Sequence, residues 1–376
     1  MKINILQYMP MNTKIEMGKE LVGALFKEKK LSEWGEIFGI HLKNLSRYRN
    51  GSRAIPLEIF LIILEMKKIS LKFFQNKISL KINNTGKFIK IGPYIDINED
   101  WIYISELIKG DGHITPNFWS ITFVNNNSIL IDYVRNFFIS LGLNKSQISL
   151  YKRDDAQFLI VRSSLLSYIF NKILEVPVGK KEEINIGSFV IKNKKFGIAA
   201  IRGAFDAEGT VTMQGSRRIS ISSQSLTWIN NLNAILNRLK IKSKIQKDSK
   251  GREKPIYRIF IYHIINLKRF NNIIKPLHSE RKNKLQRIIN NFDKNPSRLN
   301  HKKILESIQR GNLRRQDIAK DIKKDPVLVN NMISYLKNKG YIVPFEKIYT
   351  NNGCFFKYEI TGEGLLYLKE GGSYYF

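Results

Sequence analysis

The sequence contains an internal repeat between residues 99 and 293, and this repeat restricts the folds that the chain can adopt. Each copy predicts the same order of elements: a helix, two strands, a second helix, two further strands and a third helix. The first copy occupies residues 99–192 and the second occupies residues 193–293. Because two matching copies favour two similar half-domains, we predict an α+β core made of duplicated αββαββα units.

The segment before the repeat, residues 1–80, shows the helical spacing of apolar residues. Gly39 marks a tight turn between two short helices, and the second helix, residues 42–49, has a basic polar face. The run GIHLKNLSRYRNGSRAIP resembles the helix-turn-helix of phage-repressor-type regulators, which implies an all-α DNA-binding domain. A small helical bundle with merely solvated basic residues is the alternative. The candidate DNA-contacting residues on this helix are Lys43, Asn44, Arg47 and Arg49.

Two further segments complete the predicted domain organisation. Residues 81–98 predict a polar linker with a turn at residues 83–86. Residues 294–376 predict three helices and a pair of strands, and Gly340 ends the last of these helices. This order, with the ending YEITGEGLLYL, resembles a winged helix-turn-helix domain. A dimerisation or protein-docking module is the alternative, because winged helices also serve in that role.

The charge balance favours a polyanionic partner. The chain has 63 Lys plus Arg against 32 Asp plus Glu, a formal net charge of +31, and its 43% of apolar residues suffices for packed cores. The best apolar run, residues 55–66, is too short for a membrane span and contains two glutamates. We therefore expect nucleic acid, and no membrane, as the partner. The single cysteine, Cys354, argues against disulfide frameworks and predicts an intracellular, prokaryotic-type cytoplasmic protein.

Two matching segments carry the strongest chemical signal. ISELIKGDG in the first repeat ends in Asp111 and a glycine, and IRGAFDAEG in the second ends in Glu208 and a glycine. Small residues recur in both, at Gly110 in the first and at Gly203 and Ala207 in the second. Because small residues four positions apart share one helix face, two such helices can pack closely. A parallel pair would bring both acids together at the helix C-termini.

The paired acids predict a divalent metal site rather than an acid-base dyad. A helix C-terminus carries partial negative charge, so two such ends with two carboxylates attract a cation. Oxygen ligands and water favour Mg²⁺, with Mn²⁺ as the second candidate. A metal held there over a phosphodiester would support its hydrolysis. The predicted metal-binding positions are Asp111, Glu208, Gly110 and Ala207.

Both segments resemble the signature helix of the LAGLIDADG homing endonucleases, and IRGAFDAEG is close to the family pattern. The resemblance covers residues 99–293 and includes the order of strands and helices. It implies a saddle of two antiparallel sheets in the DNA major groove, with both strands cut beneath the paired helices. Asp111 and Glu208 would be the catalytic acids, and their separation of 97 positions (208 − 111) suits a monomer that carries both half-domains.

The first motif departs from the family pattern within the predicted helix seam. Glu106 stands where the second motif has Gly203, and the same seam contains Gly110 and Ala207. A glutamate between two closely packed helices must be tilted out, paired or desolvated. We therefore expect Glu106 to alter the geometry of the seam more than the position of the acids.

Two lysines are candidate participants in the reaction. Members of the resembled family carry lysines near the scissile phosphates, and Lys181 and Lys282 stand at comparable places at the ends of the two repeats. The alternative is that both are ordinary surface lysines of a lysine-rich chain.

The strands of the repeats are the expected DNA-reading elements. In RRISIS, isoleucines alternate with polar residues, so one face can pack on helices while the other meets base edges. ISLYKR and KSKIQKD offer further polar side chains. Because the two repeats differ at these positions, we predict a target that is not palindromic. The candidate residues are Tyr151, Arg153, Arg218, Ser220, Ser222, Lys244 and Gln246.

Three functions are compatible with these patterns. The leading hypothesis is a free-standing, intron-encoded endonuclease, because Met1, the lone Cys354 and the lack of a C-terminal His-Asn pair do not match an intein. The second is a regulator that binds DNA through the same saddle and helix-turn-helix modules without cutting. The third is an intron RNA maturase, which would use the basic saddle for structured RNA.

Overall fold

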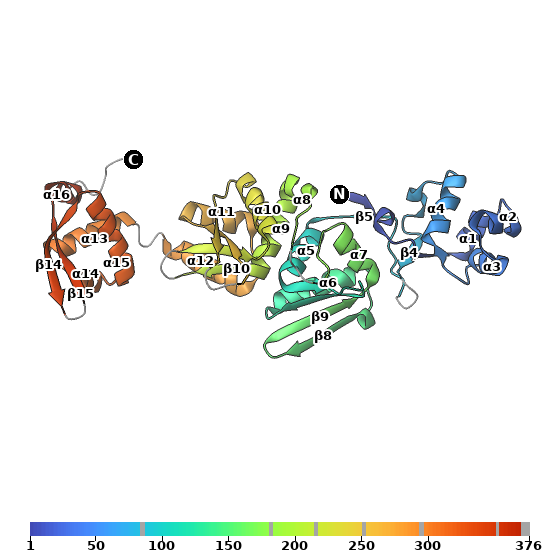
Figure 1. Cartoon of the computed structure of the whole chain (residues 1–376), viewed down its shortest axis with the longest axis horizontal. Helices are drawn as coiled ribbons and strands as arrows, with labels where there is room; N and C mark the ends of the chain where they lie inside the picture. Colours follow the sequence, from blue (N-terminus) through green and yellow to red (C-terminus); the bar gives the residue numbers. More distant parts are fainter. Residues whose placement is uncertain are drawn as a thin grey trace. The chain divides into compact units, whose positions relative to one another are not determined.

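The computed structural model describes residues 1–82, 87–179, 183–213, 217–249, 253–292, 297–350 and 353–369. The chain has the mixed α+β composition that the repeat predicted (Figure 1). Contacts divide it into two compact units: Met1–Val211 with Arg218–Asn283, and Thr212–Arg217 with Lys284–Phe376. The finer boundaries predicted from the sequence remain predictions. None of the helices in the described residues is long and apolar enough to cross a membrane.

The first repeat has the predicted order of elements, and its four strands form one antiparallel sheet in the order β6-β7-β9-β8. Its leading helix begins where the side chain of Asn98 accepts hydrogen bonds from the amides of Asp100 and Trp101. The elements are α5 (Glu99–Asp111), β6 (Gly112–Ile114), β7 (Ser120–Asn125), α6 (Ser128–Ser140), η3 (Lys145–Gln147), β8 (Ile148–Arg153), β9 (Ala156–Arg162) and α7 (Ser164–Lys172).

The second repeat has the same order, and its sheet runs β10-β11-β13-β12, which is the equivalent strand order. Ile219 and Ile221 of β11 are fully buried and pair with Ile261 and Ile259 of β13, so the predicted apolar face is confirmed. The elements are α8 (Ser188–Lys192), α9 (Lys194–Glu208), β10 (Gly209–Thr212), β11 (Arg218–Ser223), α10 (Leu226–Arg238), β12 (Lys244–Asp248), β13 (Ile256–Ile261), α11 (Ile264–Ile274) and α12 (Ser279–Phe292).

The two repeats meet where α5 packs against α9. Glycines allow this close approach. A Cβ atom at Gly203 would lie 2.5 Å from the carbonyl oxygen of Tyr103, and one at Gly110 would collide with the Cβ of Ala207. Both positions therefore require glycine because a neighbouring helix occupies the space, and the predicted seam between small residues is present in the structure.

The N-terminal region contains the two short helices that the sequence predicts, and Gly39 between them adopts the left-handed conformation (φ 63°). It also contains a three-stranded sheet, β3-β2-β4, so the expectation of an all-α domain was wrong. These strands have two to four residues, too few for a clear alternating pattern. The elements are β1 (Lys2–Asn4), η1 (Ile5–Tyr8), β2 (Lys14–Met17), α1 (Lys19–Phe26), α2 (Leu31–Phe38), α3 (Leu42–Arg49), β3 (Ile55–Pro56), α4 (Leu57–Met66), η2 (Leu71–Phe74), β4 (Ile78–Lys81) and β5 (Tyr94–Asp96).

β5 pairs with β1, and the turn predicted at residues 83–86 lies outside the described residues.

The second unit has the predicted order of three helices and a two-stranded hairpin, followed by a further helix. Asp325 accepts hydrogen bonds from the amides of Val327 and Leu328 and so starts the third helix, which Gly340 (φ 74°) follows. The elements are α13 (Ser297–Gln309), α14 (Arg315–Asp321), α15 (Pro326–Asn338), β14 (Ile342–Thr350), β15 (Gly353–Ile360) and α16 (Gly362–Lys369).

Alanine substitution at a seam glycine should destabilise the protein. We expect Gly203→Ala to cost about 1–3 kcal/mol, because its methyl group would enter the backbone of α5. Gly23→Ala, in the middle of α1 with open space around the new methyl group, is the matched control and should be neutral or stabilising by up to about 1 kcal/mol. Unfolding midpoints of both variants measure the difference, and equal midpoints would contradict the close packing of the seam.

Candidate metal and DNA site at the helix seam

Asp111 and Glu208 are the last residues of α5 and α9, and both are half-buried. The helices adjoin at this end, because a Cβ atom at Gly110 would lie 3.2 Å from the Cγ atom of Glu208. The structure thus brings together all four predicted metal-binding positions, namely these two acids with Gly110 and Ala207. Their predicted role as ligands stays a prediction.

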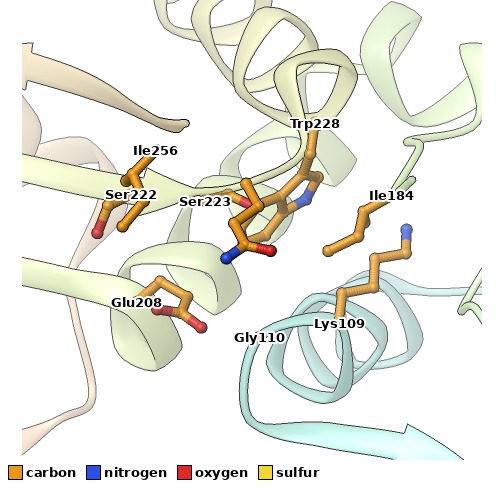
Figure 2. Close-up of a pocket in the computed structure, with 9 residues that line it drawn as sticks. Lys109, Gly110, Ile184, Glu208, Ser222, Ser223, Trp228 and Ile256 are labelled. Carbon is orange, nitrogen blue, oxygen red and sulfur yellow. The ribbon is translucent and has the colours of Figure 1, made fainter. Parts of the chain in front are cut away.

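Asp111 and Glu208 line two different pockets. Asp111 lines an open groove with Asn125 and Arg153 of the first sheet, and the side-chain amide of Asn125 donates a hydrogen bond to Asp111 Oδ2 (2.7 Å). Glu208 lines a pocket with Ser222 of the second sheet and Trp228 of α10, and Figure 2 shows Lys109 on the opposite side of that pocket. Each half-site therefore combines one acid from the seam with one sheet.

Arg281, near the start of α12, lies at the same end of the seam and was not foreseen from the sequence. Its guanidinium donates to three successive carbonyl oxygens at the C-terminus of α9: Phe205 (3.1 Å), Asp206, and Ala207 (2.8 Å). Burial lowers the pKa of Arg281, whereas the charges of Asp111, Asp206 and Glu208 oppose that shift. A partly buried cation therefore accompanies the acids.

Asp206 is a second residue that sequence reasoning missed. Its buried carboxylate accepts hydrogen bonds from the Tyr103 hydroxyl (2.9 Å) and from the backbone amides of Leu277 (2.9 Å) and His278 (3.1 Å). Burial raises the pKa of Asp206 although these donors and Arg281 favour the charged form. The only signal was an extra acid in IRGAFDAEG, two positions before Glu208. Asp206 connects α9 to α5 and fixes the chain that leads into α12.

Glu106 is both paired and desolvated, which are two of the three arrangements expected for it. Its carboxylate forms an ion pair with Lys109 (2.7 Å) and accepts a hydrogen bond from the indole of Trp228 (2.7 Å). The side chains of Glu106 and Lys109 are each only 1% exposed, and burial raises the pKa of Glu106. The missing side chain at Gly203 provides room, because a Cβ there would lie 2.8 Å from that of Glu106.

The second sheet presents one polar face, as the alternation in RRISIS predicted. Strand register places Ser220 beside Phe260, with Lys244 on the far strand, and Ser222 in the next row of the same face. Arg218 stacks its guanidinium 4.4 Å from the ring centroid of Phe260, and its buried Nε has no hydrogen-bond partner among the described residues. The row of Ser222 continues through Arg258 to the exposed Gln246.

The first sheet presents a more aromatic face. Tyr151 is 47% exposed and stacks on Phe158 of the neighbouring strand, with ring centroids 5.0 Å apart. Arg153 is exposed at the end of the same strand, 4.0 Å from Asp154. In strand register, Val124 of β7 lies beyond Phe158. The two sheets therefore offer different chemistry, and the predicted lack of target symmetry stays a prediction.

The remaining candidates lie away from the seam or outside the described residues. On α3, Lys43, Arg47 and Arg49 are exposed, whereas Asn44 is half-buried and accepts a hydrogen bond from Arg53 (3.1 Å). Lys282 is exposed on α12, directly after Arg281. Lys181 lies outside the described residues.

The donor set fits a hard divalent cation in part. In the part of the chain that the structure describes, no cluster of three or more His, Cys, Asp or Glu side chains could hold a metal. Mg²⁺ is commonly bound by one or two carboxylates with water and phosphate oxygens, so a pair of carboxylates is compatible with such a site. The carbonyl of Ala207 already accepts from Arg281. Metal ligation by Ala207 would have to use the second lone pair of this oxygen, beside the Arg281 guanidinium.

Substitutions of Glu106 and Lys109, which form the buried ion pair, should have strongly non-additive effects on the free energy of unfolding. Lys109→Met leaves the Glu106 carboxylate buried without its cation, so we expect a loss of about 3–5 kcal/mol. The double variant Glu106→Gln/Lys109→Met removes both charges and should recover most of that loss. Unfolding free energies of the two single variants and the double variant measure the coupling, and simple additivity would contradict a direct buried pair.

Comparison with known proteins places the signature in the second repeat. Residues 195–275 match a family described as a LAGLIDADG-like domain. A curated relative, a probable translation initiation factor IF-2 from Methanocaldococcus jannaschii, is 27% identical over 205 residues, which cover 52% of this chain and 17% of that protein. The chain therefore spans less than a fifth of the length of that relative.

Two solved structures are similar over part of the chain. The homing endonuclease I-DmoI in complex with DNA and Mn is 22% identical over 47% of this chain and 98% of its own, with a TM-score of 0.37. Full-length DUF199/WhiA from Thermatoga maritima is 13% identical over 65% of this chain and 93% of its own, with a TM-score of 0.35. Residues 195–275, within the second repeat, are thus similar to a LAGLIDADG-like domain.

Proposed function

We propose that the protein is a site-specific, Mg²⁺-dependent endonuclease that cuts both strands of a long, non-palindromic DNA duplex. The observation that carries this proposal is the position of Asp111 and Glu208 at the adjoining C-termini of α5 and α9. Negative helix ends and two carboxylates make this a point that attracts cations, within a chain of net charge +31. Such a carboxylate pair is most useful in a DNA-binding surface if it holds a metal.

The surrounding residues hold and orient the two acids. The side-chain amide of Asn125 donates a hydrogen bond to one carboxylate oxygen of Asp111 and so orients that carboxylate. Asp206 secures the end of α9 against α5 and α12, so that Glu208 keeps its place beside Gly110. A bound Mg²⁺ would lower the pKa of a water molecule and stabilise the leaving oxygen. Each of the two acids would then act in the cleavage of one DNA strand.

The sheet faces and the terminal domains supply the DNA contacts in this proposal. Arg218, Ser220, Ser222, Lys244 and Gln246 would read base edges from the second sheet, and Tyr151 and Arg153 from the first. Residues 1–80 would act as a helix-turn-helix domain through Lys43, Arg47 and Arg49, and residues 294–376 as a winged-helix domain. Because both half-sites lie in one chain, the protein would act as a monomer.

A second function is a regulator that binds DNA through the same surface without cutting it. The hydrogen bonds of Arg281 favour this alternative, because a built-in cation satisfies the carbonyls at the end of α9 without any metal. The retention of acids at both helix ends favours the endonuclease.

Cleavage should depend on both acids. We expect the protein to cut duplex DNA that carries its own insertion site in the presence of Mg²⁺. Asp111→Asn and Glu208→Gln should each lower cleavage by at least about 10³-fold while the affinity for DNA changes little, because these charges act only on the reacting phosphate. Strand-specific end labelling follows the cut on each strand.

Asp132→Asn is the matched control, because Asp132 is an exposed acid on α6. This variant should cut like the wild type. Tight binding without cleavage in Mg²⁺, Mn²⁺ or Ca²⁺ would contradict the endonuclease and favour the regulator.

DNA affinity should depend strongly on salt. If roughly 6 to 10 phosphates are neutralised, affinity should fall by about 10³ to 10⁵ between 50 and 200 mM salt. Fluorescence anisotropy with labelled duplex measures this slope. An affinity that is insensitive to salt would rule out a phosphate-dominated interface.

A further inference from the structure

We propose that Arg281 is a resident counter-cation of the Asp111–Glu208 pair, which holds the acids' end of the seam together before a metal binds and weakens the site's affinity for a divalent cation. Arg281 is thus a positioning residue, and the inference rests on the proposed metal-binding role of the two acids. It adds a regulatory feature to that role, because in the metal-free protein the positive charge of Arg281 compensates the two acids and opposes the binding of a cation.

The first step is the hydrogen bonding at the end of α9. The last carbonyls of a helix have no partners within the helix and must find donors elsewhere. Arg281 supplies donors to the carbonyls of Phe205, Asp206 and Ala207 through two nitrogens of one guanidinium. A planar fork with five N–H groups can serve several acceptors at once, whereas the ammonium of lysine acts as a compact point charge.

The second step is the way in which Arg281 is held. Asp206 accepts hydrogen bonds from the amides of Leu277 and His278, directly before α12. From the first repeat, Asn127 donates to the hydroxyl of Ser279 (3.0 Å). Both repeats therefore fix the start of α12, and they deliver the guanidinium to a defined place in the seam.

The third step is electrostatic. Asp111 and Glu208 both interact with the charge of Arg281, and Asp111, Ala207 and Arg281 line the same groove. In a partly buried site this attraction is screened less than in water. The guanidinium therefore compensates the two carboxylates in the metal-free protein, and a divalent cation that approaches them meets its repulsion. Removal of this charge should tighten metal binding.

The test is a titration of the full-length, metal-free protein with Mn²⁺ in the absence of DNA, followed by calorimetry or by the electron paramagnetic resonance signal of free Mn²⁺. Arg281→Gln should bind Mn²⁺ about tenfold more tightly than the wild type, because a repelling charge has gone. Arg281→Lys keeps the charge, so its affinity should stay within about twofold of the wild type while its unfolding midpoint falls. An affinity of Arg281→Gln equal to or weaker than that of the wild type would overturn the proposal.

Arg202 provides a matched control. Arg202 lies on the seam helix α9, and its Nε donates a partly buried hydrogen bond to the carbonyl of Ile274 (2.6 Å). Arg202→Gln therefore also removes the contact of an arginine with a backbone carbonyl. This variant should lower stability and leave Mn²⁺ affinity unchanged. If Arg202→Gln tightened Mn²⁺ binding as much as Arg281→Gln does, the effect would come from the general loss of positive charge and not from the position of Arg281.

A measurement on the wild type covers the case in which Arg281→Gln does not fold. With arginine-selective isotope labelling, the guanidinium signals of Arg281 should shift when diamagnetic Mg²⁺ is added, and unchanged signals at saturating Mg²⁺ would overturn the proposal. Asp111→Asn and Glu208→Gln separate this inference from the proposed function. If these variants bind Mn²⁺ like the wild type, the metal site itself is wrong, whereas wild-type affinity of Arg281→Gln contradicts only the role of Arg281.

Discussion

The close approach of α5 and α9 is the constraint on which the rest of the site depends. Gly203 lies against the backbone of α5, and Gly110 lies against Ala207, so the two helices meet without intervening side chains at these points. The C-termini of the two helices also adjoin, which places Asp111 and Glu208 close together although 97 positions (208 − 111) separate them in sequence. Any larger side chain at either glycine would separate the acids as well as the repeats.

The seam is asymmetric because each motif contributes different buried charges. Glu106 and Lys109 of the first motif stand where the second has Gly203 and Asp206. The first pair connects α5 to Trp228 of α10, whereas Asp206 connects α9 to Tyr103 and to the start of α12. Buried charges cost free energy unless they are paired, so these networks specify which helices may neighbour each other. Asp111 and Glu208 are consequently held in place by different buried networks.

Repetition made most of the core predictable from the sequence. The order of elements in both repeats, the alternation in β11 and the seam between small residues follow from periodicities that a single chain displays. The short strands β2 and β3 could not be foreseen, because two to four residues carry too little pattern. Arg281 was missed for another reason: one arginine among 63 cationic residues gives no signal until the fold brings it to the end of α9.

The central claim is that the two acids form one cation site at the end of the seam. The most direct test is anomalous X-ray diffraction from crystals of the full-length protein bound to duplex DNA and soaked in Mn²⁺. The account predicts manganese peaks at the adjoining ends of α5 and α9, with carboxylate oxygens of both Asp111 and Glu208 among the ligands. Well-ordered density for both carboxylates without a manganese peak, or manganese bound only elsewhere, would contradict it.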